Sequence, residues 1–352
     1  MPTQVTATYA DVHAWGNLYL AYRKAAKGKR GRRSAASFEY KLEDNLIHLQ
    51  MELADGSYHP SPYSNFTIHE PKKRLISAAP FRDRVVHHAL CNLIEPAFEQ
   101  SFINHSYANR KNKGTHAALD TAQKWARRYP FFLQCDIKQF FPSIDHAILQ
   151  RELYRRIQDG DLRNLVNKIL ESGIGVIPEE YEPVLFTGDD LFAYARPRGL
   201  PIGNLTSQFW ANCYMNPFDH FVTQTLTCHA YLRYVDDFIL FGTDQKQLWL
   251  WRDAIEEKLA NLRLVIHHKR AEVKPVRQGI PFLGFVIYPT HRMLKRRCGI
   301  NYQRRVSLLM NHYHTHTQNR DQVDRSVRGW LNHARYGDTW GLRKALLREV
   351  RL

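Results

Sequence analysis

The spacing of apolar residues along the chain alternates between helical and strand-like stretches. Apolar side chains recur at helical spacing over 8–29 and over 34–56, and Gly56 stands where helices commonly end. Alternating apolar and polar residues over 63–80 predict two strands joined by a turn that contains a proline. The stretch 82–100 is again helical. A largely helical region with one strand pair is therefore expected to open the chain.

The middle of the chain carries short apolar stretches that predict strands between helices. Residues 131–136 form an apolar run that ends in a charge, and Asp145 is placed to cap a helix over 145–157. Glycine, proline and acidic residues over 173–198 predict an irregular insertion. The later expected elements are helices over 204–226 and 245–262, strands over 229–235 and 238–243, a hairpin over 280–289, and basic helices after about residue 300. This order resembles a split βαβ unit with an antiparallel sheet, so the expected fold class is α+β.

Charge narrows the range of partners. The 352 residues include 50 Lys and Arg against 34 Asp and Glu, which gives a net charge of +16 and attracts polyanions. No apolar run approaches the roughly 18–20 residues of a membrane span, so no membrane contact is expected. The five cysteines lack the spacing of a zinc knuckle or disulfide framework, which fits a reducing cytoplasm. Nucleic acid is the favoured partner, and a basic enzyme without such a partner is the alternative.

Three carboxylates form the clearest chemical pattern. Asp236 and Asp237 join two apolar strands, and Asp136 ends another. Like charges crowded beside apolar strands are destabilising unless a cation lies between them. Asp tolerates the positive φ of a tight turn, so this spacing is sterically reasonable, and an ordinary Asp-rich turn is the alternative. Three carboxylates from two neighbouring strands can hold two Mg²⁺ ions about 3.5–4 Å apart, as in phosphoryl transfer to a primer hydroxyl.

Seven ordered blocks over roughly 60–290 resemble the motifs of reverse transcriptases. The blocks read KKRLISAAPFRDRVV, FINHSYANRKNKGTHAAL, FFLQCDIKQFFPSIDH, RGLPIGNLTSQ, YVDD, RLVIHHK and IPFLGF in chain order. The resemblance implies a right-hand polymerase with fingers, a palm built on the antiparallel sheet and a small helical thumb. It also implies RNA-directed DNA synthesis from dNTPs, with template RNA and a DNA or RNA primer as partners.

The resemblance assigns roles to single residues in the catalytic centre. Asp136, Asp236 and Asp237 match the catalytic metal carboxylates, with the Ile137 carbonyl as a further ligand. The ions implied are two Mg²⁺, with Mn²⁺ as a substitute. Phe141 matches the steric gate that excludes a ribose 2′-hydroxyl, although a core phenylalanine is the alternative reading.

Other matched positions are expected to contact the nucleotide or the nucleic acid. The nucleotide-binding set comprises Lys72, Arg74, Phe141, Ile202, Gly203, Gln208 and Lys269. Within it, Lys72 and Arg74 match cations that grip the triphosphate, and Lys269 is either a basic residue behind the site or structural. Arg82 and Arg84 either contact template phosphate or pair with acids. Arg30, Arg32 and Arg33 belong to a basic tract that reads as a solvated loop or as a phosphate-binding arm.

The fourth block departs from the QGxxxSP form of group II intron and retroviral enzymes. Ile202 replaces its glutamine and Gln208 replaces its proline. This form, together with SVRGWLNHARYG over 326–337, resembles the reverse transcriptases of diversity-generating retroelements within the group II intron-like superfamily. Those enzymes misincorporate opposite template adenines during mutagenic retrohoming, and they act with a small, basic, oligomeric accessory protein. A bacterial or phage-encoded cytoplasmic enzyme is implied.

Domain boundaries and rival functions follow from the same pattern. Residues 1–59 are expected to form an N-terminal helical and basic extension at the start of the fingers, 60–290 the fingers and palm, and 291–352 the thumb. A retron-like or antiviral defence reverse transcriptase is the nearest alternative. A non-catalytic nucleic-acid-binding scaffold conflicts with the three intact aspartates, and an RNA-dependent RNA polymerase conflicts with Phe141 at the gate position.

Overall fold

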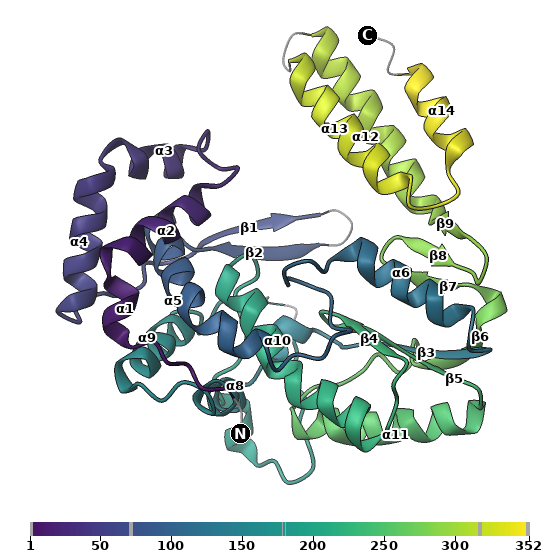
Figure 1. The fold of residues 1–352 in the computed structure, drawn as a ribbon, viewed down its shortest axis with the longest axis horizontal. Coiled ribbons are helices and arrows are strands. Elements are labelled where there is room, and N and C mark those ends of the chain that lie inside the picture. The colour runs from purple at the N-terminus through teal and green to yellow at the C-terminus, as the bar shows by residue number, and fades with distance from the viewer. Residues whose placement is uncertain (1–2, 70–72, 178, 180, 316–318, 350–352) are drawn as a thin grey trace. The chain divides into compact units, whose positions relative to one another are not determined.

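A computed structural model describes residues 3–69, 73–177, 179, 181–315 and 319–349. The chain separates into two compact units that interleave along the sequence (Figure 1). The first unit comprises 1–104, 136–227 and 253–267, and the second comprises 105–135, 228–252 and 268–352. Within the described residues, no helix is long and apolar enough to cross a membrane.

Helices open the first unit, as the apolar spacing predicts. They are α1 (Tyr9–His13), α2 (Trp15–Ala26), α3 (Arg33–Tyr40) and α4 (Leu42–Ala54). The single helix expected over 34–56 is wrong, because Lys41 leaves helical geometry with φ −123° and ψ 54°. The Asn45 side chain donates to the Phe38 carbonyl at 2.9 Å and so satisfies a group that the break exposes. The break lets Phe38 pack against the Phe81 ring, with centroids 5.2 Å apart.

A hairpin and two long helices follow in the same unit. Strands β1 (Ser64–Ile68) and β2 (Arg74–Ala78) pair antiparallel, and the predicted strand pair is thereby confirmed. Helix α5 (Phe81–Glu99) packs against α2 and against α10 (Leu205–His220). Helix α10 ends in a π-helical turn over Phe221–Thr225.

Shorter helices complete the first unit. They are α7 (Phe140–Ser143), α8 (His146–Tyr154) and α9 (Gly160–Glu171). Asp145 caps α8 by accepting from the Ile148 amide at 3.0 Å, as predicted from the sequence. The described part of the insertion over 173–198 contains one short 3₁₀ helix, Leu191–Ala195, and is otherwise irregular, as expected. Helix α11 (Gln245–Asn261) contributes to both units.

A four-stranded sheet forms the centre of the second unit. Its order is β4-β5-β3-β6, from β4 (Tyr231–Tyr234), β5 (Asp237–Gly242), β3 (Phe131–Asp136) and β6 (Glu272–Pro275). Strands β4 and β5 form the predicted hairpin, and β3 pairs antiparallel with β6. Strand β6 lies outside the stretches predicted as strands. Side chains of the sheet share a buried cluster with α6 (Thr115–Ala126).

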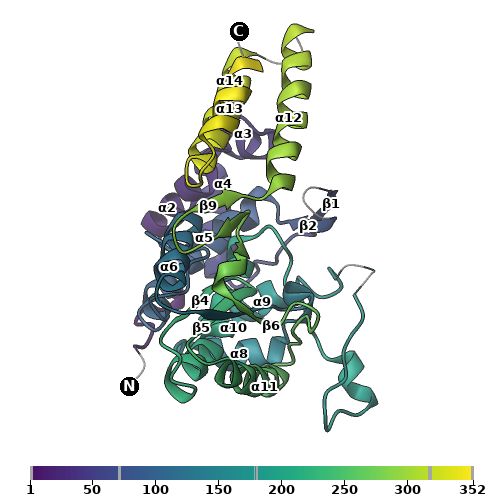
Figure 2. The same cartoon turned by 90° about the vertical axis from the view of Figure 1, so that its right-hand side faces the viewer.

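A second small sheet and a helical bundle end the chain. Strands β7 (Ile280–Phe282) and β8 (Phe285–Ile287) form the predicted hairpin, and β9 (Arg292–Leu294) adds an unpredicted third strand. Helices α12 (Arg296–His314), α13 (Arg320–Ala334) and α14 (Trp340–Glu349) lie side by side in both views (Figures 1 and 2). Their core includes Tyr302 stacked on Trp330, with ring centroids 4.5 Å apart.

Candidate active site

Asp136 lies on the partly exposed face of strand β3. The buried residues Leu133 and Cys135 alternate with the partly exposed Gln134 and Asp136. Because side chains alternate along a strand, Gln134 and Asp136 point to the same face. The Asp136 carbonyl accepts from the His267 amide at 2.8 Å, and the His267 Nε2 lies 4.0 Å from the Asp136 Oδ2. This hydrogen bond therefore holds the backbone of Asp136 against the segment that contains His267.

Ile137 continues this pairing in a way that turns its carbonyl outward. Ile137 faces Ile266 in an isolated antiparallel bridge. The bridge uses the Asp136 carbonyl and the Lys138 amide, which donates to the Val265 carbonyl at 2.7 Å. In such a pair the polar groups of the central residue point away from the partner strand. The Ile137 carbonyl, expected from the sequence to be a metal ligand, is thus not used by this bridge.

The YVDD turn is built on a strained valine. Tyr234 pairs with Asp237, so Val235 and Asp236 form the two-residue tip. An aspartate would tolerate a positive φ in this turn, but it is Val235 that adopts it, at +61°. A β-branched residue in this region is a genuine outlier, with a conformational cost of about 1–3 kcal/mol.

Arg233 holds this turn from inside the fold. Its side chain is only 1% exposed, and its guanidinium donates to the Val235 carbonyl at 2.9 Å and to the Ser106 hydroxyl at 3.2 Å. These bonds offset the strain at the tip. The sequence analysis missed this residue, and the only available signal was a cation inside an otherwise apolar strand.

Gln134 connects β3 to the carboxylate that begins β5. Its Nε2 donates to the Asp237 Oδ1 at 2.9 Å and to the Pro281 carbonyl at 3.2 Å. Strands β3 and β5 are neighbours in the sheet. Asp237 also acts on Lys295: burial lowers the pKa of Lys295, and the Asp237 charge raises it. The sequence analysis missed both residues, although the alternation along β3 places Gln134 on the Asp136 face.

Carboxylate oxygens at the ends of strands are the donor type that Mg²⁺ and Mn²⁺ prefer. In chemistry, Asp136, Asp236 and Asp237 therefore fit the metal role expected from the sequence. In the part of the chain that the structure describes, no three His, Cys, Asp or Glu side chains form a group that could hold a metal ion. Asp136 is counted with the first unit, and Asp236 and Asp237 with the second.

Phe140 and Phe141 occupy different environments at the start of α7. Phe140 is 2% exposed and belongs to the core, whereas Phe141 is partly exposed. The two rings meet edge to face with centroids 5.4 Å apart. The Phe141 carbonyl accepts from the Leu200 amide at 2.9 Å. The backbone of Phe141 is therefore anchored while its ring keeps an open side.

The Ile202-Gly203-Asn204 segment is fastened to the base of the β1-β2 hairpin. The Ile202 carbonyl accepts from the Ser77 amide at 2.9 Å. Buried Asn204 accepts from the Ala79 amide at 3.0 Å and donates to the Ser77 carbonyl at 2.8 Å. Gly203 has φ +116°, and a Cβ there would meet an Ile76 methyl at 2.9 Å. Only glycine fits this approach without strain.

The remaining predicted nucleotide contacts lie in exposed or partly exposed positions. Arg74 begins β2 and is exposed, and Gln208 is partly exposed on the first turns of α10. Lys269 is exposed in a turn between α11 and β6. Lys72 lies outside the described residues.

The arginines expected to meet nucleic acid fall into two groups. Arg82 pairs with Glu52 and lies over the Tyr58 ring, and Arg30 pairs with Glu39 at 3.3 Å. Arg84 and Arg32 instead come close enough to influence each other: burial lowers the pKa of Arg84 first, and Arg32 lowers it further. Exposed Arg33 begins α3, so the tract is not wholly a loop.

Lys29 joins Arg32 and Arg84 in this group, which is called the cation cluster below. Its pKa is lowered by burial and then by the charges of Arg84 and Arg32. Cations that disfavour one another in this way gain stability when an anion binds between them. Lys29 was missed in the sequence analysis, although it lies in the same basic tract.

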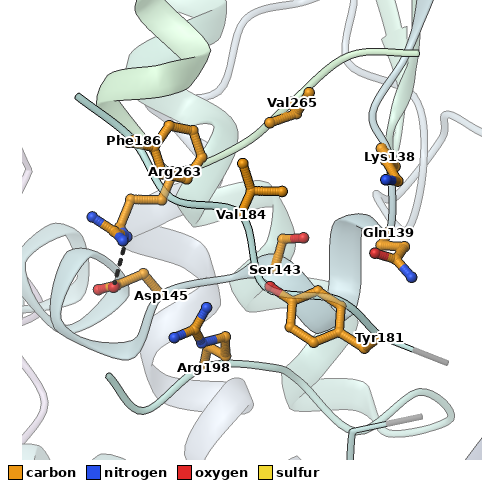
Figure 3. A pocket seen from close by; sticks show the side chains of 10 residues that line it. All are labelled: Lys138, Gln139, Ser143, Asp145, Tyr181, Val184, Phe186, Arg198, Arg263 and Val265. Carbon is orange, nitrogen blue, oxygen red and sulfur yellow. Dashed lines mark ion pairs between the residues drawn. The ribbon is translucent and has the colours of Figure 1, made fainter. Parts of the chain in front are cut away.

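A small cavity lies beside the segment that follows Asp136. It encloses about 20 Å³ and is lined by Lys138, Gln139, Ser143, Asp145, Tyr181, Val184, Phe186, Arg198, Arg263 and Val265 (Figure 3). This volume holds about one water molecule, so it is not a substrate pocket. Its walls show how the 173–198 insertion is attached.

Two arginine–carboxylate pairs attach the insertion. Arg196 donates to both carboxylate oxygens of Asp145, at 2.7 and 3.1 Å. Arg263 donates to both oxygens of Asp189, at 2.7 Å each, and lowers the pKa of that carboxyl to about 2. Bidentate pairs of this kind fix geometry as well as charge. The irregular segment therefore has a defined position against α8 and α11.

Comparison with known proteins adds an independent line of evidence. Residues 67–287, more than half of the chain, match the family described as reverse transcriptase (RNA-dependent DNA polymerase). Protein YkfC of Escherichia coli (strain K12) is 25% identical over 309 residues, which cover 76% of this chain and 76% of YkfC. The group II intron-encoded protein LtrA of Lactococcus lactis subsp. cremoris is 26% identical over 185 residues, which cover 52% of this chain.

The match reaches only 29% of LtrA, so the chain corresponds to less than a third of that relative. A solved structure of telomerase from Candida albicans, in complex with a fragment of telomeric RNA, aligns with a TM-score of 0.46 and 13% identity. That alignment covers 68% of this chain and 46% of the telomerase chain.

Proposed function

The chain belongs to the reverse transcriptase family, and from this premise we propose that it is an RNA-templated DNA polymerase with Asp136, Asp236 and Asp237 as catalytic carboxylates. The observation that carries the assignment is the bond from Gln134 to Asp237. Gln134 shares its strand face with Asp136. This contact supports the proposal that the acids at the end of β3 and at the start of β5 act together.

Each carboxylate has a role in binding and orientation. Asp136, Asp237 and the outward Ile137 carbonyl would hold divalent ions, and Asp236 would complete the set from the turn. When bound, Mg²⁺ supplies charge neutralisation at the triphosphate and a lowered pKa for the primer hydroxyl, with Mn²⁺ as a substitute. The protein's own work is mainly to position these groups, because phosphoryl transfer needs little covalent chemistry from side chains. Arg233 keeps the turn in place for this purpose.

The nucleotide is expected to lie between the β1-β2 hairpin and the palm residues of the same unit. Arg74, with Lys72, would grip the triphosphate, and Lys269 would add a further cation. The open side of Phe141 would meet the sugar. Because Gly203 has no side chain, the base pair of template and nucleotide could approach the backbone closely there. Gln208 would contact this base pair from α10. The anchoring of Ile202 and Asn204 to Ser77 supports a fixed geometry for this surface.

The RNA template is expected to follow the cation cluster. Lys29, Arg32 and Arg84 lack the acidic partners that Arg30 and Arg82 have among the ion pairs of the described residues. We assign 1–59 to an N-terminal extension and the start of the fingers, 60–290 to fingers and palm, and 291–352 to the thumb. The three-helix bundle within the last range supports the thumb assignment.

The finer proposal is a diversity-generating retroelement enzyme that makes adenine-mutagenised cDNA. Its support is Ile202, which keeps the bulk of a glutamine but offers no donor or acceptor to the nascent pair. Losing a positioning bond of about 1 kcal/mol relaxes discrimination several-fold. A small basic accessory protein and a bacterial or phage cytoplasm belong to this proposal. A retron-like or defence enzyme is the rival.

The experiment combines synthesis and sequencing. The purified chain receives an adenine-containing RNA template, a primer, dNTPs and Mg²⁺, with and without a co-expressed small neighbouring protein. We expect cDNA with errors concentrated at template adenines, none from Asp236→Ala, and fewer adenine errors from Ile202→Gln. Faithful cDNA would favour the retron-like or defence reading. If Asp236→Ala matches the native chain in cDNA yield, the catalytic assignment is wrong.

A further inference from the structure

The Gln134 side chain connects the four-stranded sheet to the β7-β8-β9 sheet, through Asp237 and Pro281. One amide hydrogen is directed to the Asp237 Oδ1 at 2.9 Å and the other to the Pro281 carbonyl at 3.2 Å. Pro281 is the central residue of β7. The amide therefore joins the first residue of β5 to a strand more than forty residues further along the chain.

The chemistry of the partners fixes the orientation of this amide. A carboxylate and a backbone carbonyl both accept hydrogen bonds, so only the NH₂ end of Gln134 can face them. Both donor hydrogens are then used on the protein. Rotation of the side chain would break two bonds at once, which makes Gln134 a rigid support rather than a mobile surface residue.

The hydrogen bond from Gln134 holds one oxygen of the Asp237 carboxylate, the Oδ1. A carboxylate that is free to rotate must lose rotamer freedom when it binds a ligand, whereas a held carboxylate has lost it already. Groups that hold a metal ligand from behind typically affect metal affinity or activity by 10- to 100-fold. The Asp237 charge also acts to raise the pKa of Lys295, against the lowering by burial, so Asp237 has a cationic neighbour as well.

We propose that Gln134 is a positioning residue for Asp237, which holds its carboxylate ready for a divalent ion and ties it to Pro281 on β7. The proposal rests on the assignment of Asp237 as a metal ligand. Strand β7 belongs to the small sheet that precedes α12. Through the same amide, a displacement of that sheet would also displace the Asp237 carboxylate.

The test uses variants that keep the size of the side chain. Gln134→Met retains an unbranched chain of similar length but cannot donate a hydrogen bond. Gln150→Met is the matched control, because Gln150 makes a comparable amide bond, to Asn167 at 2.8 Å, on α8. Far-UV circular dichroism and thermal unfolding establish that each variant is folded. Mn²⁺ binding by electron paramagnetic resonance gives a readout that does not depend on turnover.

We expect Gln134→Met to weaken Mn²⁺ binding and to lower kcat by about 10- to 100-fold, with the KM for template–primer unchanged. Gln150→Met should behave as the native chain. Native Mn²⁺ affinity in Gln134→Met, or an equal loss in Gln150→Met, would overturn the proposal.

Asp237→Asn separates this inference from the function on which it rests. If Asp237→Asn abolishes cDNA synthesis while Gln134→Met is native in binding and rate, only the positioning role fails. If Asp237→Asn is fully active, the assignment of Asp237 itself fails.

Discussion

Single residues in the candidate site show where local rules and tertiary contacts disagree. By local preference, an aspartate or glycine would take the positive φ of a two-residue hairpin loop. The turn instead places Val235 there, with a buried Arg233 bound to its carbonyl. Similarly, Phe140 and Phe141 are equal candidates for the core on composition alone. The structure buries Phe140 and leaves one side of Phe141 open.

The gate role of Phe141 gives a prediction at the residue scale. In Phe141→Ala the ring that would collide with a ribose 2′-hydroxyl is gone, so ribonucleotide incorporation should rise while dNTP incorporation persists. Primer extension with each rNTP and dNTP, compared as kcat/KM, measures the change. Phe140→Leu is the control, and it should alter stability rather than sugar choice. Unchanged sugar discrimination in Phe141→Ala would assign the ring to packing alone.

Helix α5 carries a buried histidine, His87, that affects the stability of the whole helix. His87 is 1% exposed, and neither ring nitrogen has a hydrogen-bond partner among the described residues. Burial lowers the pKa of His87 to about 3, with smaller contributions from His88 and Arg84. The histidine is therefore kept neutral inside a helix that packs against α2 and α10.

His87 makes the stability of the first unit depend on acid. Below the ordinary histidine pKa of about 6.5, His87 binds a proton in the unfolded chain but stays neutral in the folded chain. Stability should then fall by up to about 1.4 kcal/mol per pH unit as pH drops from about 6.5 toward 3. His87→Leu should remove this contribution and raise stability at pH 5, as measured by urea unfolding at several pH values. Exposed His48→Leu is the control, and an unchanged slope in His87→Leu would contradict the prediction.

Charge acts at the scale of the whole molecule. A net charge of +16 draws the chain to polyanions in general, but only some cations are available to them. Arg30 and Arg82 are paired with Glu39 and Glu52, whereas the cation cluster brings like charges together. Bringing like charges together is unfavourable in the absence of an anion. The proposed phosphate contact at the cation cluster would relieve this repulsion.

RNA affinity should therefore fall as the salt concentration rises, and the cation cluster should account for part of this salt dependence. Each neutralised phosphate contributes about −0.7 to the slope of log affinity against log salt for single strands. Arg32→Gln should make the slope shallower by about this amount, whereas Arg30→Gln, already paired with Glu39, should change it less. Fluorescence anisotropy of a labelled RNA over a salt series measures both. Equal slopes for the two variants would remove the distinction between paired and clustered arginines.

The sequence alone determined those features that depend on neighbours along the chain. Alternation of apolar and polar residues predicted the β1-β2 hairpin, and short apolar runs predicted β3 and the β4-β5 hairpin. Helical spacing predicted α5, and a capping side chain placed the start of α8. The ordered blocks predicted the family, since seven motifs in register are seldom matched by chance. Asp136 and Asp237 were found because each acid interrupts an apolar strand.

Only the tertiary structure decided which distant groups meet. Gln134 reaches Asp237 and Pro281, and Arg233 reaches Ser106. Arg196 and Arg263 attach the insertion through Asp145 and Asp189. Such pairs are invisible to periodicity, because strand order and loop closure bring them together rather than chain spacing. Strand β6, which pairs with β3, and the break at Lys41, which lets Phe38 contact Phe81, have the same origin, since each depends on partners remote in sequence.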